Sequence, residues 1–464
     1  MSANSISNTA FSALQNAQAG VELTSQNVNG QTVAGYTRRR LDAGTNPVLS
    51  NTAPGLGPGV SVSGFSRDWS ALLQQQRVSQ AGVTAYHGAV ADGLAALDSA
   101  AADPALALDA PVNNFFASLA TLARNPSNAP ALAAVKAQGT ALLSAAQQFQ
   151  DGLATVQSNA RAQLASGVAQ LNSIGSELAL INRHIATSQS AGGAGPGPAE
   201  LDRRDALLLQ AGGLVGGDLG LNPDGQAYVF IDGQPLVNGD AAGQLQATPQ
   251  SPEATAPLAL AMRFGVPGRE PPPVSVVLRA SALQGSIGGQ LVLAADPSLV
   301  LQPGGEPVPK LAAFTDLFAA AAGQTPAGAS QLTRALALLG AFNAKKSPVA
   351  ADSAALDAAL GGLAAQSNNT DPVLGGNALQ GGLLDSWRTF QGQLGAQVSV
   401  QLSRQSASAA VETRLSNDFQ SQSGVNLDEE AANLMRYQQA YSAASKLLQT
   451  NATLLDGLLA VVGR

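Results

Sequence analysis

The C-terminal stretch of this chain, residues 424–464, restricts its possible folds more than any other part of the sequence. Large apolar side chains recur there at every seventh position, namely Leu427, Leu434, Tyr441, Leu448, Leu455 and Val462. No proline interrupts this series, and the one glycine within it is Gly457. A heptad repeat of this length predicts a long helix with one apolar seam, which needs a partner along its length.

Polar residues specify the start of this helix. Asn426 is a favourable N-cap, and Glu429 stands three positions further on, as in a capping box. Asp428, Glu429 and Glu430 place negative charge in the first turn, where the helix dipole stabilises it, so we interpret them as a helix start and not as metal ligands. At about 1.5 Å per residue the helix would run roughly 50 Å to Val462, which is too long for a small domain to cover.

A partner for this helix is available at the other end of the chain. Residues 5–28 form a second amphipathic helix candidate, in which Leu14, Val21 and Val28 are seven residues apart. Pairing the two ends closes a very long loop, but the entropy of closure grows only logarithmically with length, so seam packing can offset it. The facing sides also carry polar residues, which suit a many-helix assembly better than an isolated pair; they are Gln18, Ser25, Gln438, Ser445 and Asn451.

Composition indicates an elongated molecule in which helices pack closely against one another through small side chains. Hydrophobic residues make up 45% of the chain but aromatic residues only 4%, because the apolar share is mostly alanine and leucine. The net charge of -7 argues against nucleic acid or an anionic membrane as a partner, and the only basic run, Arg38–Arg40, is expected in a solvated loop. We expect no membrane span, since no stretch approaches about eighteen consecutive apolar residues, and the N-terminus has no Sec signal pattern.

The sequence offers little for metal, cofactor or catalytic chemistry. There is no cysteine, and the two histidines, His87 and His184, are far apart in the chain. No nucleotide-binding, zinc-protease or serine-hydrolase motif occurs, so we expect no catalytic residue, no cofactor and no metal site. Tyr437 and Tyr441 lie one helical turn apart beside Arg436; we interpret them as an intersubunit contact, with ordinary intrachain core as the alternative.

The rest of the chain divides into a helical body and a β module inserted in it. No proline occurs between 132 and 187, where Leu164, Leu171, Leu178 and Ile185 recur every seven positions, and helical periodicity is also visible from 65 to 97 and from 383 to 421. Around Leu214 the period changes to alternation, with turn residues separating short apolar runs as far as GGQLVLA at 288–294.

We therefore predict a mainly α fold with an inserted β module, in an elongated molecule. It has long terminal coiled-coil-type helices, a helical rod domain and a small antiparallel β domain. The terminal helical assembly domain comprises residues 1–58 and 424–464, the rod domain 59–212 and 301–423, and the β domain 213–300. Within the rod, the charges of the DRRD run at 202–205 are expected on a solvated helix face.

Several stretches resemble a known family. Residues 423–448, SGVNLDEEAANLMRYQQAYSAASKLL, are similar to the C-terminal signature of bacterial flagellar hook-associated protein 1, the first hook–filament junction protein. Gly35, Tyr36 and Arg38 match the N-T-P-G-Y-S-R pattern of rod, hook and hook-associated proteins, with Ala34 in place of the usual proline. Weaker similarity occurs at 201–210, 224–239 and 285–291, and little is seen from 297 to 377.

The resemblance implies a structural subunit of the flagellar axis that joins hook to filament. It also implies a secreted, extracellular protein, exported unfolded by the flagellar type III apparatus without a cleaved signal. The partners implied are further copies in a ring or helical lattice, the hook protein, the second junction protein and a cytoplasmic export chaperone on the C-terminal helix. Nucleic acid and membrane are not expected as partners.

The expected assembly interface consists of seam residues from both terminal helices: Leu14, Val21, Val28, Leu427, Leu434, Tyr437, Tyr441, Leu448, Leu455 and Val462. An amphipathic helix that cannot bury its stripe within its own subunit becomes ordered when neighbours supply the other face. Two alternatives stay open at this stage. One is another hook-associated or hook subunit; the other, of a different class, is a flagellum-associated glycan hydrolase.

Overall fold

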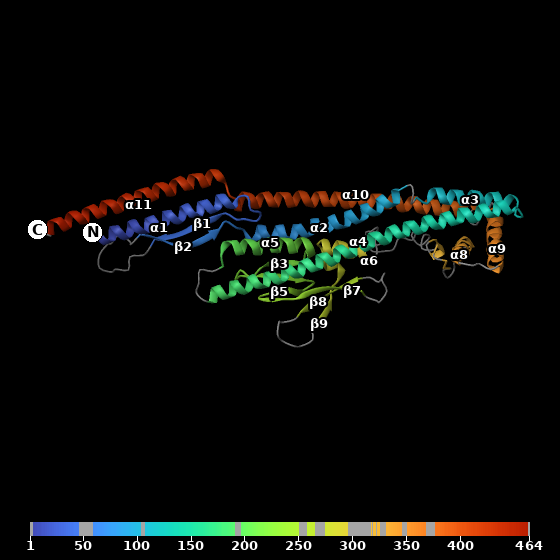
Figure 1. Ribbon diagram of the computed structural model, residues 1–464, viewed down its shortest axis with the longest axis horizontal. Coiled ribbons are helices and arrows are strands. Elements are labelled where there is room, and N and C mark those ends of the chain that lie inside the picture. The colour runs from blue at the N-terminus through green and yellow to red at the C-terminus, as the bar shows by residue number, and fades with distance from the viewer. Residues whose placement is uncertain are drawn as a thin grey trace.

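The computed structural model of the chain is an elongated molecule built from long helices (Figure 1). The structure describes residues 3–45, 59–103, 107–190, 196–249, 258–264, 274–295, 317, 319–321, 323–324, 331–345, 350–367 and 376–462. Residues 46–58 and most of the segment from 296 to 330 therefore lie outside the described residues.

The two ends of the chain lie side by side at one end of the molecule (Figure 1). Helix α1 spans Ala3–Gly30 and helix α11 spans Leu427–Val462; they run antiparallel and in contact. The predicted cap is present, since the Oδ1 atom of Asn426 accepts a hydrogen bond from the backbone N–H of Asp428 at 3.0 Å. An antiparallel hairpin of β1 (Arg39–Thr45) and β2 (Val60–Arg67) lies against α1.

Three long helices form the shaft of the body. Helix α2 (Ala71–Ala102) packs along α10 (Gly376–Ser423), and α4 (Ala129–Ser190) extends past the β sheets to the far end (Figure 1). Ser70 caps α2 by accepting a hydrogen bond from the backbone N–H of Leu73 at 3.4 Å. Each of these helices turns an apolar face toward its neighbours, and the buried residues of the shaft are mostly leucine, alanine and valine.

A first apolar cluster lies at the end away from the termini. There α3 (Asp109–Arg124), α8 (Gln331–Ala344) and α9 (Ala350–Ser367) pack around α4 and the first turns of α10. Trp387 is fully buried in this cluster and meets the ring of Phe149 edge-on, with 5.2 Å between centroids. Phe390 joins the same aromatic group, with 5.7 Å between its ring centroid and that of Trp387.

A second apolar cluster joins α4 to two small antiparallel sheets. Asn182 of α4 fixes the first sheet, donating to the carbonyls of Ala227 and Gly239 and accepting from the N–H of Ala227, at 2.7–2.8 Å. Asn172, ten residues earlier in α4, binds the second sheet in the same way: its amide donates to the carbonyl of Leu245, and its Oδ1 atom accepts from the N–H of Leu245. The strand order is β3-β4-β5-β6 in one sheet and β7-β8-β9 in the other.

The elements of this region have the following bounds: α5 Pro198–Val215, β3 Asp218–Leu221, β4 Ala227–Ile231, β5 Gln234–Asn238, β6 Ala241–Ala242, β7 Gln244–Pro249, β8 Leu258–Phe264, β9 Val274–Val277, a 3-10 turn Ala280–Ala282 and α6 Ser286–Ala295.

The fold class predicted from the sequence is confirmed: the molecule is elongated and mainly α, with long terminal helices and small antiparallel sheets. Within the described residues, every helix is too short or too polar to cross a bilayer. The domain boundaries remain predictions, and all strands of the two small sheets fall inside the range 213–300.

Two predictions inside these ranges were wrong. The run at 288–294 was predicted as a strand but belongs to helix α6, which is buried against α2, α4 and α5. A short apolar run flanked by glycine fits a buried helix as well as a strand, and only the neighbouring helices decide between them. Phe65 was predicted in a helix, but it pairs with Leu41 in the β1-β2 hairpin and α2 begins only at Ala71.

Candidate functional site where both chain ends meet the body

Helices α1 and α11 pack through small and polar side chains. In α11 the contacting row is Glu430, Tyr437, Ala444 and Asn451, which are seven residues apart. Glu430 meets Asn27, Asn451 donates a hydrogen bond to Ser7, and the Tyr437 ring covers Gly20. Because α1 presents mainly alanine, glycine, threonine and asparagine to this side, the two helices approach closely.

Of the predicted seam residues, Tyr437 belongs to this row and the others are outside it, and those whose side chains are described are only partly covered. Leu14, Val21, Leu434, Tyr437 and Leu448 are half-buried. The more exposed ones are Val28 (40%), Leu427 (45%), Tyr441 (44%) and Leu455 (36%). Val462 lies in α11, in the part whose side chains are not described. Within one subunit, therefore, most of the large apolar side chains of the heptad repeat do not form the helix contact.

Arg38 connects four parts of the chain at the base of this helix pair. Its backbone N–H donates to the carbonyl of Ser423 at 2.8 Å, and its carbonyl accepts from the N–H of Asp68 at 2.9 Å. Its guanidinium donates to Glu430 at 2.8 Å and to Glu429 at 2.6 Å. Burial opposes the charge of Arg38, but Glu430 and both hydrogen bonds outweigh it and raise the Arg38 pKa.

Asn27 completes the contact with all of its hydrogen-bonding groups occupied. Its amide donates to the Arg39 carbonyl at 3.0 Å and to Glu430 at 3.3 Å. Its Oδ1 atom accepts from the Arg39 N–H at 3.0 Å and from the Tyr36 hydroxyl at 2.9 Å. Burial, opposed by the nearby Arg39, raises the pKa of Tyr36, so the hydroxyl remains a donor.

A second ionic cluster joins the hairpin to helix α5. Arg67 donates to Asp202 at 2.8 Å and to Asp205 at 3.0 Å, and Arg204 donates to Asp205 at 2.7 and 2.9 Å. These four side chains are nearly buried, at 3–11% exposure. Thr37, two residues before β1, adds a hydrogen bond to Asp202, so the segment that leads into β1, strand β2 and helix α5 meet at one carboxylate.

These clusters correct two predictions made from the sequence. The Arg38–Arg40 run is not a solvated loop, because Arg38 lies under α11 and Arg39 begins strand β1. In the run at 202–205 only Arg203 is on a solvated face, where it binds Glu177 at 2.6 Å. Arg204 pairs with the adjacent Asp205, whereas Asp202 and Asp205 both bind Arg67, which is far away in sequence and which local spacing does not show.

The joint between the terminal helices and the body is polar. Among the described residues, the apolar clusters contain no member of α1, β1, β2 or α11. The contacts that hold this joint are the ion pairs and hydrogen bonds of Arg38, Arg67 and Thr37.

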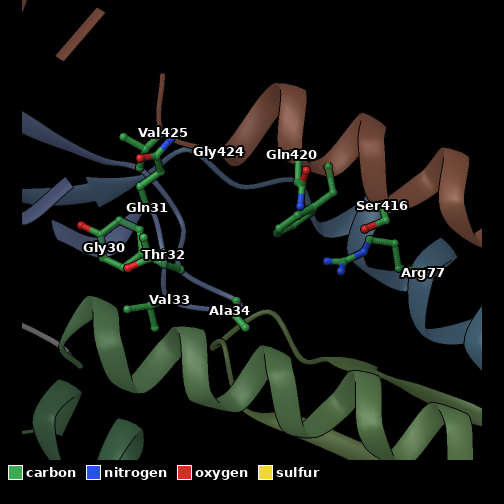
Figure 2. A pocket seen from close by; sticks show the side chains of 13 residues that line it. Gly30, Gln31, Thr32, Val33, Ala34, Arg77, Ser416, Gln420, Gly424 and Val425 are labelled. Carbon is green, nitrogen blue, oxygen red and sulfur yellow. The ribbon is translucent and has the colours of Figure 1, made fainter. Parts of the chain in front are cut away.

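A groove of about 430 Å³ opens on one side of this joint (Figure 2). Its walls are the turn after α1, residues 30–36, one face of α2 at Arg77, the last turns of α10 and the turn at 424–425. Figure 2 shows the guanidinium of Arg77 directed into the open space between α10 and the turn that carries Thr32. Phe419 lies under that guanidinium, 4.1 Å from it to the ring centroid.

The histidines and carboxylates of the described residues serve packing and pairing. His184 hydrogen-bonds to Glu200 at 2.7 Å on an exposed surface, and His87 contacts Gln401 at 3.0 Å between α2 and α10. In the part of the chain that the structure describes, no three histidine, aspartate or glutamate side chains are placed to hold a metal ion.

Comparison with known proteins defines the class to which these features correspond. Residues 94–302 match the family model of the flagellar hook-associated protein FlgK helical domain. Residues 417–461 match the C-terminal model of the flagellar basal body rod FlgEFG proteins. Both matches are to domains of proteins of the bacterial flagellum.

Individual relatives narrow this class. Flagellar hook-associated protein 1 of Salmonella typhimurium is 30% identical over 260 residues, which are 54% of this chain and 46% of that protein. The proteins of the same name from Escherichia coli and Bacillus subtilis are 29% and 28% identical, over 53% and 47% of this chain. The resemblance to flagellar hook-associated protein 1, predicted from the C-terminal residues, is confirmed.

The matched region is partial. The chain spans about half the length of the curated relatives it matches, 44–46% of each. The flagellar hook junction protein FlgK of Burkholderia pseudomallei superposes with a TM-score of 0.43 at 24% identity, over 49% of this chain and 40% of that one.

Proposed function

We propose that this chain is a structural subunit of the bacterial flagellar axis, that it joins hook to filament, and that it assembles through its terminal helices. The observation that carries the proposal is the pairing of α1 and α11, which leaves large apolar side chains of both helices uncovered. The matches to FlgK and to rod-protein C-terminal domains identify the structure in which such helices would meet.

The uncovered side chains form an extended surface on α11. Large apolar residues there are between one third and three fifths exposed: Leu427, Met435, Tyr441, Leu447, Leu454 and Leu455. Fully burying one such side chain contributes about 1.5–3 kcal/mol, and these are already partly covered, so a neighbour that covers several of them contributes several kcal/mol to association.

The proposed assembly is a ring or helical lattice of copies of the chain. A contact between two different faces of the same subunit repeats head to tail and produces rings or helical tubes, whereas a self-complementary contact stops at a dimer. Because the exposed rows on α1 and α11 differ in sequence, they suit the head-to-tail arrangement. The hook protein and the second junction protein are the proposed neighbours at the two ends of this lattice.

The same apolar surface suggests how the subunit is handled before assembly and where it acts. Before assembly, an export chaperone would cover the apolar rows of the C-terminal helix in the cytoplasm. The chain would then be exported by the flagellar type III apparatus and act outside the cell, at the hook–filament junction. Its role is structural and not catalytic, and a zymogram on cell-wall glycan should show no clearing by the purified chain.

Truncation tests the proposal directly. Removing residues 448–464 takes away the end of α11 but none of the apolar clusters of the body. We therefore expect a soluble protein with native body helices that no longer restores motility to a strain lacking the gene. Electron microscopy of that strain should show normal hooks without filaments, together with filament protein shed into the medium.

Two outcomes would contradict the proposal. Restored motility with the truncated chain would show that the terminal helices are not the assembly surface. A strain without the gene that lacks hooks, or that carries filaments, would assign the chain to another position on the flagellar axis.

A further inference from the structure

The groove of Figure 2 contains a cation without an acidic partner. Arg77 is half-buried and, among the described residues, is the only charged one that lines the groove. Within the described residues no carboxylate lies within 4 Å of its guanidinium, and its one side-chain hydrogen bond is a long contact of 3.3 Å to Gln74. The other arginines at this joint, Arg38, Arg67 and Arg204, all bind carboxylates.

Burial makes the missing partner costly. A half-buried guanidinium loses part of its hydration, and a nearby acidic group normally compensates this loss. Burial lowers the pKa of Arg77, although Glu412 and Asp205 oppose the shift from a distance. The Phe419 ring offers only its electron-rich face, which is weaker than an ion pair.

The rest of the groove wall is suited to a carboxylate. Gln31, Thr32, Ser416 and Gln420 line it, and among the described residues their side chains make no hydrogen bond. A volume of about 430 Å³ accommodates an acidic side chain together with its neighbours in the chain. A single guanidinium matches one negative charge and forms two parallel hydrogen bonds with a carboxylate.

We infer that this groove binds an aspartate or glutamate side chain of a second copy of the chain. The inference rests on the proposed function, because it needs copies of the chain to be neighbours in an assembly. Two observations favour a second copy. First, the chain has a net charge of -7, so each copy presents an excess of carboxylates to the next. Second, the groove borders the residues just before α11, beside the exposed seam proposed for assembly.

The groove would also make subunit contact depend on prior folding of the joint. Its walls come from segments far apart in sequence, since Arg77 of α2 and residues 416–420 of α10 meet within the body and residues 30–36 join them only when the turn after α1 has docked there. A neighbour would therefore find this site complete only on a subunit whose N-terminal segment is already docked on the body.

Arginine substitutions test the inference in flagella isolated from the source bacterium. Arg77→Gln should reduce incorporation of the chain into flagella about tenfold, whereas Arg77→Lys, which keeps the charge, should reduce it less. The matched control is Arg414→Gln on α10, whose side chain is 83% exposed and paired within its own helix to Asp418. Hydrogen exchange of α1 and α11 in the purified Arg77→Gln chain should match that of the unmodified chain, which separates a lost contact from misfolding.

Cross-linking identifies the occupant. A photocrosslinking amino acid placed at position 420, on the exposed rim of the groove, should produce a dimer-sized adduct when assembled flagella are irradiated. Mass spectrometry should find the attached peptide in a second copy, within a few residues of an aspartate or glutamate.

Three results would overturn the inference. They are equal incorporation of Arg77→Gln and the unmodified chain, an adduct only with a different flagellar protein, and an adduct with a peptide free of acidic residues. If the unmodified chain is absent from flagella, the proposed function itself fails. If it is present and the groove variants behave like it, only the inference about the groove fails.

Discussion

Replacing Gly20 by alanine tests how closely α1 packs on α11. The Tyr437 ring covers Gly20 so tightly that an added Cβ would lie 2.4 Å from Cδ1 of that ring. Carbon atoms normally meet at about 3.5–4.0 Å, so the helices must separate by about 1 Å or the ring must leave its position. Such overpacking costs about 1–3 kcal/mol, whereas alanine gains about 1 kcal/mol over glycine in a helix interior. We expect the helix pair to lose up to about 2 kcal/mol.

Gly457→Ala is the matched control in the same helix pair. A Cβ at Gly457 would meet nothing within 4 Å, so only the helix-propensity gain remains. The position lies near the end of α11, where helices fray, and the gain is therefore at most about 1 kcal/mol. The two substitutions are chemically identical and are expected to have opposite effects.

Hydrogen exchange followed by mass spectrometry measures both effects locally. A change of one to two kcal/mol alters the population of the open state about 5- to 30-fold, so peptides of α1 and α11 should exchange that much faster in Gly20→Ala. Peptides of α4 should not change, because they belong to separate apolar clusters. If Gly20→Ala slows exchange in α1 and α11, as Gly457→Ala should, the close approach of the two helices is wrong.

Two further predictions concern ion pairs. Glu430→Ala should destabilise the joint by about 2 kcal/mol, which is less than the loss of a fully buried ion pair because Arg38 keeps a second carboxylate. Glu429→Ala, at a position whose side chain is 54% exposed, should cost less than about 1 kcal/mol. Exchange protection in β1 and the first turn of α11 measures this, and equal effects would refute the assigned roles. The hydrogen bond from Arg203 lowers the Glu177 pKa below its ordinary 4.5, so this contact stabilises the fold above pH 4.5 and is lost as the pH falls through the lowered value. An NMR titration of Glu177 with a midpoint at or above 4.5 would contradict it.

The long helices could be predicted from the sequence because their signals are local. The heptad repeat, the Asn426 cap and the acidic first turn predicted α11 from Leu427, where the structure begins it. The helix predicted over 132–187 is α4, Ala129–Ser190. Cap, period and absence of proline are all properties of neighbouring residues, so they need no knowledge of the rest of the fold.

The candidate site could be predicted only in part. The sequence indicated that α1 and α11 associate, but it favoured the leucine rows and missed Gly20, Asn27 and Glu430. Tyr437 was predicted as an intersubunit contact, and within the subunit its ring covers Gly20. The hairpin was missed, although the alternation around Val60 and Val62 was a usable signal. Nothing local connects Asn27 to Glu430, which are 403 residues apart.

By itself, the sequence determined the class of architecture and the existence of an apolar surface that one helix could not bury alone. Periodicity decides these because it states which side chains share a face. Only the tertiary structure decided which face of each terminal helix is used within the subunit and which remains for neighbours. That choice depends on how closely two backbones can approach and on whether Arg38, Arg67 and their carboxylates find one another, and both conditions involve residues hundreds of positions apart.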